Sequence, residues 1–274
     1  MDRSDIANRM KEFYETVLKT KLMRRCPVVV RLDGKSFHSF TRGFNKPFDE
    51  LLIKSMQDTM KYLCENIQGV VLGYCQSDEI SLILVDYKKL NSSAFFDYEV
   101  QKVCSITASM ATMAFNKYFQ KKVDGYFDYF LESWNHDEKD EKLFDSYFKS
   151  INKGAMFDSR CFNIPKEEVT NYIYWRQLDC IRNSVQMVGQ ANFSERELHK
   201  KNREQIKEML ITQKGINWED LPAYQKYGSC CVKEKYQCEN IDIKDGAVIR
   251  TRWVIDKNIP VFKNEGRQYI ERLI

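Results

Sequence analysis

The sequence predicts an α+β fold whose centre is a ferredoxin-like split βαβ sheet. Three observations lead to this class: short β-branched runs typical of buried strands, longer segments with apolar residues at helical spacing, and the order in which the two alternate. That order is strand, helix, strand, strand, helix, strand, which is the split βαβ arrangement. With 274 residues, 43% of them hydrophobic, the chain is long enough to bury such a core.

The predicted strands are short apolar runs with clear ends. The first follows Pro27 and ends at Asp33 and Gly34, a pair typical of turns. The second and third are joined by a polar turn at residues 76–78. The split βαβ unit takes its strands from residues 27–32, 69–74, 79–85 and 155–162, and two further short strands are predicted near 229–235 and 247–255.

The predicted helices carry apolar residues three or four positions apart. In the second helix, Met56, Met60 and Leu63 would share one face. Residues 132–154 are charged and aromatic without a clear period, and residues 135–142 are predicted to form a mobile surface loop. The helices are predicted at residues 5–18, 48–66, 94–120, 166–190 and 194–213.

This order divides the chain into two predicted parts. Residues 1–165 would form a polymerase-type palm, the catalytic domain, because palms of many polymerases and nucleotide cyclases share the split βαβ topology. Residues 166–274 would form a C-terminal helical region with short strands, packed on the palm. Topology alone does not identify the chemistry, so the function has to be argued from particular residues.

The composition excludes several classes of protein. A net charge of +4, from 43 basic and 39 acidic residues, is too small to indicate nucleic-acid binding by itself. Nine cysteines without a CxxC pair, beside three histidines, are expected to be reduced core residues of a cytoplasmic protein and not zinc ligands. The polar N-terminus does not resemble a signal peptide, and no apolar run approaches the roughly 18 residues of a membrane span.

Carboxylates stand at two of the predicted strand ends. Asp33 ends the first strand, and Asp78 and Glu79 lie where the second strand turns into the third. Carboxylates gathered at one sheet edge repel each other unless cations neutralise them, and their hard oxygens suit Mg²⁺. Two such ions, roughly 3.5–4 Å apart, can activate an attacking oxygen and stabilise the leaving one.

The residues after the first strand suit a phosphate group. Gly34 lacks a Cβ and lets the backbone approach a phosphate, while Lys35, Ser36 and His38 add polar groups beside it. Lys46 precedes the second helix, where it could act as a point charge on a triphosphate. Taken singly, each feature is more often structural, because Asp-Gly is usually a turn and Ser-Asp-Glu a cap or a solvated loop. Their common place in the topology favours a nucleotide site.

Six motifs resemble those of the tRNA(His) guanylyltransferase family. Together they cover roughly residues 31 to 228, in order and at fitting spacing, which makes a chance match far less plausible than for a single short motif. The motifs are residues 31–38, 44–49, 73–79, 157–160, 174–180 and 215–222.

The resemblance implies a metal-dependent nucleotidyltransferase that adds NTP-derived nucleotides to the 5′ end of tRNA in the 3′–5′ direction. ATP would first activate a 5′-monophosphate, and GTP or other NTPs would then be added. Two Mg²⁺ ions, tRNA as the partner and a homotetrameric assembly are implied as well.

The resemblance also implies roles for residues of this sequence. Asp33, the Gly34 carbonyl and Asp78 would hold the metals, Glu79 would lie close to them, and Lys46 would assist activation. The nucleotide would be bound by Gly34, Lys35, Ser36, Phe37, His38 and Ser77, and Lys102, Arg160 and Asn183 would contact nucleotide or RNA.

Three departures from the family pattern bear on the substrate. Phe48 stands where eukaryotic members have asparagine, Ile181 where they have histidine, and Ile206 where they have lysine. The pattern looks more like the bacterial and archaeal guanylyltransferase-like proteins, which resemble template-dependent enzymes that repair 5′-truncated tRNA. The alternatives are a dedicated tRNA(His) guanylyltransferase, a nucleotide cyclase or forward polymerase, and an inactive RNA-binding homologue. The isoleucines could also merely fill the core of a helix pair.

Overall fold

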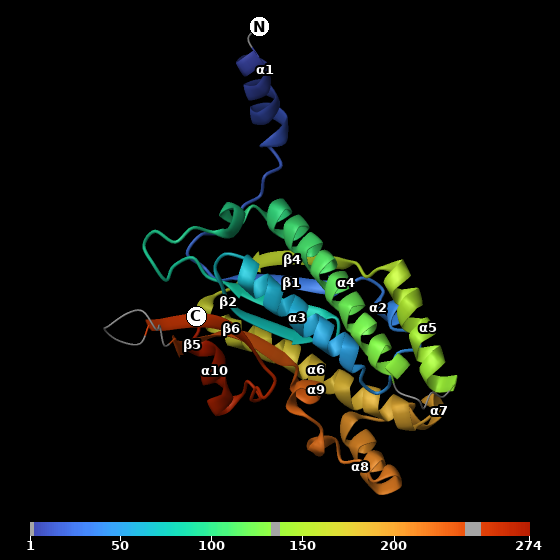
Figure 1. Cartoon of the computed structure of the whole chain (residues 1–274). Coiled ribbons are helices and arrows are strands. Elements are labelled where there is room, and N and C mark those ends of the chain that lie inside the picture. Colours follow the sequence, from blue (N-terminus) through green and yellow to red (C-terminus); the bar gives the residue numbers. More distant parts are fainter. Residues whose placement is uncertain (1–2, 133–137, 239–247) are drawn as a thin grey trace.

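The computed structural model describes residues 3–132, 138–238 and 248–274, and its centre is a six-stranded sheet (Figure 1). The strand order is β4-β1-β3-β2-β5-β6, and each pair of neighbours is antiparallel. The strands are β1 (Val28–Gly34), β2 (Val70–Gln76), β3 (Glu79–Leu84), β4 (Phe157–Asn163), β5 (Ser229–Cys238) and β6 (Val248–Asp256).

Helices cover both faces of the sheet (Figure 1). The long helices α3 (Glu50–Asn66) and α4 (Val100–Glu132) lie on one face, and α6 (Val169–Asn192) lies on the other with the C-terminal α10 (Gln268–Glu271). Side chains along β1 alternate between the two faces of the sheet. Val28 and Val30 pack in the core on the side of α3 and α4, and Val29 packs in the core on the side of α6.

Shorter elements connect and flank these layers. The N-terminal α1 stands away from the body of the molecule (Figure 1). The remaining helices are α1 (Arg3–Met10), α2 (Phe37–Phe40), α5 (Glu138–Lys153), α7 (Glu195–Leu198), α8 (Arg203–Lys214) and α9 (Ala223–Tyr227), with single turns η1 (Lys11–Glu15), η2 (Phe95–Tyr98), η3 (Lys166–Glu168), η4 (Trp218–Asp220) and η5 (Asn264–Arg267).

The predicted order of strands and helices is present, and the chain is a mixed α/β protein built on an antiparallel sheet. The two short C-terminal strands do not form a separate layer, since β5 pairs with β2 and extends the same sheet. The palm assignment and the boundary at residue 165 stay predictions.

The prediction for residues 132–154 was wrong. Helix α5 occupies residues 138–153, and residues 135–137 of the expected surface loop lie outside the described residues. Phe144 and Tyr147 of α5 pack on α4 through Tyr126, with ring centroids 5.2 and 6.5 Å apart. The acidic residues of the first turn obscured the helical spacing of this apolar face in the sequence. The helix is stabilised by packing of that face on α4.

The helix predicted at residues 194–213 is two helices. Ser194 caps the short α7, and Asn202 caps α8 with Gln205 in a reciprocal capping box. Between the two helices the backbone leaves the helical conformation at His199. Ser194 and Asn202 each satisfy free N–H groups at the start of a helix, so the segment contains two helix starts and is not continuous.

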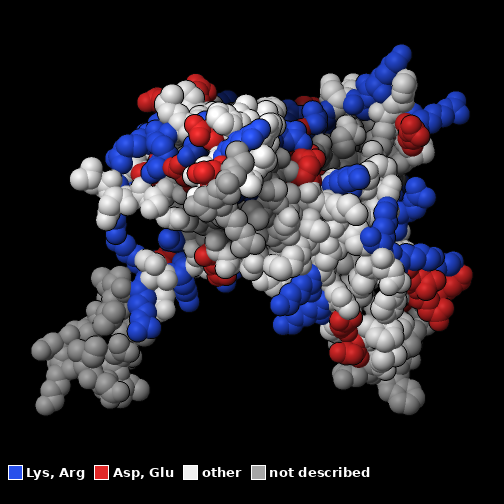
Figure 2. All heavy atoms as spheres, turned by 90° about the horizontal axis from the view of Figure 1, so that it is seen from above, with Lys and Arg blue, Asp and Glu red and all other residues white. Residues whose placement is uncertain are grey.

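Surface features agree with the balanced composition. Lys and Arg are spread over the face shown in Figure 2, with Asp and Glu in smaller groups. The eight cysteines whose side chains are described are all free thiols. Among the described helices, none combines the length and apolar character that a membrane crossing requires.

Candidate active site at the ends of β1 and β3

The predicted carboxylates meet at the end of β1. Asp33 is the direct partner of Glu79 on β3 and of Asp158 on β4, and opposite residues of an antiparallel pair point to the same face. The N–H of Gly34 donates to the carbonyl of Asp78 at 3.1 Å, which ties the strand end to the β2–β3 turn. The sheet register therefore brings together what the sequence had only placed at two separate strand ends.

Burial and the charge of Asp33 raise the pKa of two of the acidic groups, Asp78 and Glu79. Burial raises the pKa of Asp78, and the charge of Asp33 adds to the rise, while the Ser77 hydroxyl at 3.0 Å opposes it. Burial also raises the pKa of Glu79, again with a contribution from Asp33. Such a site favours a bound cation, because a positive charge would relieve the repulsion among the ionised carboxylates.

The carboxylate of Glu79 is already engaged by an arginine. Nε of Arg176 donates to it at 2.7 Å, and both side chains are buried. The same guanidinium donates to Asp179 at 2.9 Å. Glu79 therefore forms a buried ion pair with Arg176. In this respect Glu79 differs from a carboxylate that is free to bind a ligand.

Sequence reasoning assigned no role to Arg176, although a signal was present. The buried face of α6 carries Val169, Tyr172 and Ile173, and Arg176 follows on the same face by helical spacing. A charged residue in a row of buried apolar residues indicates a buried partner.

A cavity of about 480 Å³ adjoins the carboxylates. Ser36 adopts a left-handed conformation (φ 55°), and the chain then turns into the short α2, so that the segment wraps around the cavity. The residues that line it are Gly34, Ser36, Phe37, His38, Thr41, Phe44, Asn45, Lys46, Pro47, Asp49, Leu52, Ser77, Asp78 and Met187.

Most of the predicted nucleotide-binding residues line this cavity, and Lys35 is the exception among them. The side chain of Lys35 is exposed, and its N–H donates to the carbonyl of Met156 at 2.8 Å, which joins the segment to the start of β4. Lys46 and His38 approach the cavity from separate parts of the segment, so that two side chains of basic type face one space.

Hydrogen bonds to the buried side chain of Asp49 fix the segment that bears Lys46. Asp49 caps α3 by accepting from the N–H of Leu52 at 3.0 Å, and it also accepts from the N–H of Asn45 and the hydroxyl of Tyr147, at 3.1 and 2.6 Å. Gly34 is required at the other end, because a Cβ there would lie 2.2 Å from the ring of Phe37.

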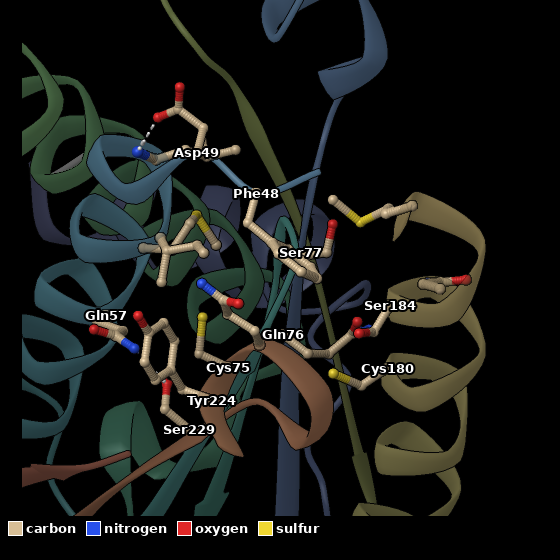
Figure 3. Close-up of a pocket in the computed structure, with 16 residues that line it drawn as sticks. Phe48, Asp49, Gln57, Cys75, Gln76, Ser77, Cys180, Ser184, Tyr224 and Ser229 are labelled. Atoms are coloured by element: carbon tan, nitrogen blue, oxygen red, sulfur yellow. Dashed lines mark hydrogen bonds between the residues drawn. The ribbon is translucent and has the colours of Figure 1, made fainter. Parts of the chain in front are cut away.

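A smaller pocket of about 80 Å³ lies beside the cavity (Figure 3). Asp49, Leu52, Ser77 and Met187 belong to both, so the two spaces share a wall. The far side of the smaller pocket is formed by α6 and by the turn into β5, and Figure 3 shows Cys180 and Ser184 on the α6 side of it.

The three predicted RNA-binding residues do not share one surface. Arg160 lies on β4 and pairs with Asp158 at 2.7 Å, on the face turned away from α4. Lys102 lies on α4, on the opposite face of the sheet, 3.9 Å from Glu99. Asn183 lies on α6 and lines the smaller pocket.

The three departures from the family pattern share one apolar cluster. Ile206 is fully buried in it together with Val185 and Trp218, and Phe48 and Ile181 pack against it. The isoleucines therefore fill the contact between α6 and α8, which favours the packing explanation over one based on substrate choice.

Comparison with known proteins assigns the chain to a family. The family model described as tRNA(His) guanylyltransferase matches residues 7–165, which is more than half of the 274 residues. The chain belongs to this family. The predicted family and the predicted enzyme class are thereby confirmed, since members are nucleotidyltransferases that act on the 5′ end of tRNA(His).

Individual relatives agree with this assignment. An uncharacterized protein of Acanthamoeba polyphaga mimivirus is 31% identical over 251 residues, covering 86% of this chain and 80% of the relative. Among solved structures, a bacterial tRNA(His) guanylyltransferase-like protein in complex with ATP is similar with a TM-score of 0.78 at 38% identity. The same kind of protein in complex with GTP gives a TM-score of 0.75 at 36% identity, and each covers 98% of both chains.

Proposed function

We propose that this chain repairs tRNA by adding NTP-derived nucleotides to a truncated 5′ end, in the 3′–5′ direction and guided by the opposite strand. One observation carries the proposal: Asp78 lines the cavity that Lys46 and His38 also face, and the N–H of Gly34 ties Asp78 to the strand end that bears Asp33. The bacterial guanylyltransferase-like proteins, solved with ATP and with GTP, give further support because the similarity extends over nearly the whole chain.

The proposed reaction has two transfers. In the first, an oxygen of the RNA 5′-monophosphate attacks the α-phosphorus of ATP, a P–O bond forms, and pyrophosphate leaves. In the second, the 3′-hydroxyl of an incoming NTP attacks the 5′-phosphorus of the RNA, AMP leaves, and the hydroxyl proton passes to solvent. RNA that already carries a 5′-triphosphate needs only the second transfer, with pyrophosphate as the leaving group.

We infer that the residues around the cavity bind and orient the triphosphate. Backbone N–H groups of residues 36–38 could donate to phosphate oxygens, and the cation of Lys46 would neutralise phosphate charge. The hydroxyl groups of Ser36 and Ser77 could donate to phosphate oxygens. Phe37 serves by packing, because its buried ring supports the turn at Gly34.

The donor set suits Mg²⁺. Among the described residues, no group of three or more His, Cys, Asp or Glu is arranged to hold a metal. Asp33 and Asp78 would supply two ligands and the Gly34 carbonyl a third, and Mg²⁺ usually completes its shell with water and substrate phosphates. When bound, the ions would activate the attacking oxygen and stabilise the leaving one.

We also propose that the palm ends at residue 165, that the protein forms a homotetramer and that it is cytoplasmic.

The N-terminal segment supports the proposed assembly. Phe13, Val17 and Leu18 are 62%, 68% and 72% exposed on an arm that leaves the body of the molecule (Figure 1). Light scattering of the whole chain and of Leu18→Asp tests this, and a monomeric wild type would contradict it.

The function is tested with purified protein, a tRNA lacking its first nucleotide, and each NTP in turn. The four opposing template bases are compared, the product 5′ ends are sequenced, and full-length tRNA(His) competes. Addition of the complementary nucleotide supports repair, whereas guanosine added whatever the opposing base, with tRNA(His) as the better substrate, contradicts it. Asp33→Asn and Asp78→Asn should lower transfer by about 10²–10³ or more, and exposed Asp124→Asn on α4 should not.

A further inference from the structure

An exposed tryptophan stands on the α6 side of the sheet, near the carboxylates. Trp175 is 52% exposed, although indole rings are usually buried. The guanidinium of Arg176 lies 4.3 Å from its ring centroid, and the ring of Tyr172 lies 6.0 Å away. One side of the indole is therefore supported by protein while much of the ring faces solvent, which is how a stacking platform is built.

The direction of α6 places this ring above the edge strand. Tyr172 packs on Phe162 of β4 at 5.8 Å, and Arg176, one turn later, reaches Glu79 at the carboxylate end of β3. Trp175 lies between these two contacts along the helix. On β4 the same direction leads from Phe162 to Arg160, so Trp175 stands on α6 at the level of the strand end that carries Arg160 and Asp158.

Two arginines face each other directly beneath this region. Arg31 of β1 and Arg160 of β4 are register partners, and like charges opposite each other on a sheet are destabilising unless an anion joins them. Asp158 pairs with Arg160 at 2.7 Å. In the described part of the chain, Nε of Arg31 is buried and has no hydrogen-bond partner. Arg31 as a whole is half-buried, so an anion that comes from outside would meet its terminal nitrogens and not the buried Nε.

This surface and the nucleotide cavity lie on different sides of the end of β1. Arg31 and Asp33 share the side of β1 that Val29 turns toward α6. The cavity is lined mainly by the segment with Gly34, Phe37 and Lys46, and α3 and α6 each add one residue, Leu52 and Met187. A molecule at the arginines would therefore reach Asp33 without entering the space proposed for the triphosphate, whose lining includes Asp78 but neither Asp33 nor the arginines.

We propose that Trp175, Arg31 and Arg160 bind the 5′ end of the RNA, and this rests on the proposed function. The terminal base pair stacks on the free side of the indole, and the 5′-phosphate meets Arg31 and Arg160 beside Asp33. A nucleic-acid end fits both features at once, because it joins a flat aromatic face to a phosphate. The two sides of β1 would then present the 5′ end and the incoming nucleotide to each other.

Binding is measured without any NTP, so that it does not depend on turnover. The probe is a 5′-phosphorylated RNA hairpin with a blunt end, compared with a closed dumbbell RNA of the same sequence. Wild type should prefer the hairpin. Trp175→Ala should weaken hairpin binding about 5- to 150-fold, which corresponds to about 1–3 kcal/mol, and should remove the preference over the dumbbell.

Two further variants separate stacking from structure. Trp175→Phe keeps an aromatic face and should keep most of the affinity, whereas Leu178→Ala removes an exposed apolar group (39%) from the next turn of α6 and should change nothing. Arg31→Gln should reduce the salt dependence of hairpin binding by about one phosphate contact.

The outcomes distinguish this inference from the proposed function. Loss of end-specific binding in Trp175→Ala supports the platform even if the wild type transfers no nucleotide, in which case only the proposed function fails. If Trp175→Ala binds the hairpin as Leu178→Ala does, the platform is wrong even in an active enzyme. It is equally wrong if the substitution raises KM for the NTP and leaves hairpin affinity intact, since the ring would then stack on the incoming nucleotide.

Discussion

The buried pair between Arg176 and Glu79 should be the most sensitive polar contact of the site. The two side chains are 9% and 7% exposed, so solvent screens their attraction little. Arg176→Met would leave the carboxylate of Glu79 buried without its partner, and breaking such a pair typically costs about 3–5 kcal/mol. We therefore expect unfolding in urea to shift to markedly lower concentration, with transfer activity lost in parallel.

The pH dependence of this loss has a definite sign. Burial raises the pKa of Glu79, and the hydrogen bond from Arg176 opposes the rise, so removing Arg176 should raise that pKa further. Above the pKa of an unfolded glutamate, about 4.3, the unfolded chain then releases a proton that the folded variant keeps. Stability of the variant should fall as pH rises through this interval, making the penalty smaller at about pH 5 than at about pH 8.

A double variant and a control complete the test. Glu79→Gln with Arg176→Met removes both charges and should recover part of the lost stability, because no buried charge is left alone. Arg182→Met, on the same helix, breaks a largely exposed pair with Asp179 and should cost less than about 1 kcal/mol. A penalty for Arg176→Met no greater than that for Arg182→Met, or one that does not vary with pH, would refute this account of the pair.

Three further predictions concern the cavity and the helix contacts. Lys46→Ala should lose activity on 5′-monophosphate RNA and recover part of it on 5′-triphosphate RNA if Lys46 acts in activation; equal loss on both, by initial rates, would assign it to nucleotide addition in general. Gly34→Ala should lower stability by about 1–3 kcal/mol and weaken NTP binding, because the new Cβ lies 2.2 Å from Phe37, whose ring is held between Phe115 and Phe157. Its control is Gly125→Ala on α4, where no atom lies within 4 Å of the new Cβ. Calorimetry should show a small gain in stability for this control. Ile206→Val should cost about 0.5–1.5 kcal/mol without altering the choice between truncated tRNA and tRNA(His); altered competition kinetics in a stably folded variant would restore a role in specificity.

Local sequence patterns predicted the elements whose formation depends on residues close together in the chain. The β-branched run after Pro27 and the turn at Asp33 mark a strand and its end wherever they occur, because side-chain period and turn chemistry act over a few residues. Helix α5 was missed for the complementary reason. Its first turn is charged, and the face formed by Phe144 and Tyr147 has meaning only beside α4.

The isoleucines are a case that a motif comparison alone does not decide. At positions 181 and 206 the sequence departs from a pattern of polar residues, and a lost hydrogen bond to RNA was one explanation. Both side chains belong to the cluster between α6 and α8, and Ile206 has no exposed surface. The choice between packing and recognition depended on which neighbours surround the side chain, and these come from distant parts of the chain.

The sequence by itself determined the family, the order of the strands and helices in the split βαβ unit, and the presence of carboxylates at two strand ends. Motifs and periodic patterns are properties of short segments, so they can be recognised without knowing what they pack against. The tertiary structure decided which groups meet: Asp33 opposite Glu79, Arg176 beneath them, and an exposed Trp175 beside two facing arginines. These contacts depend on strand register and on how α6 crosses the sheet, and both follow from burial summed over the whole core, which no short stretch of sequence contains.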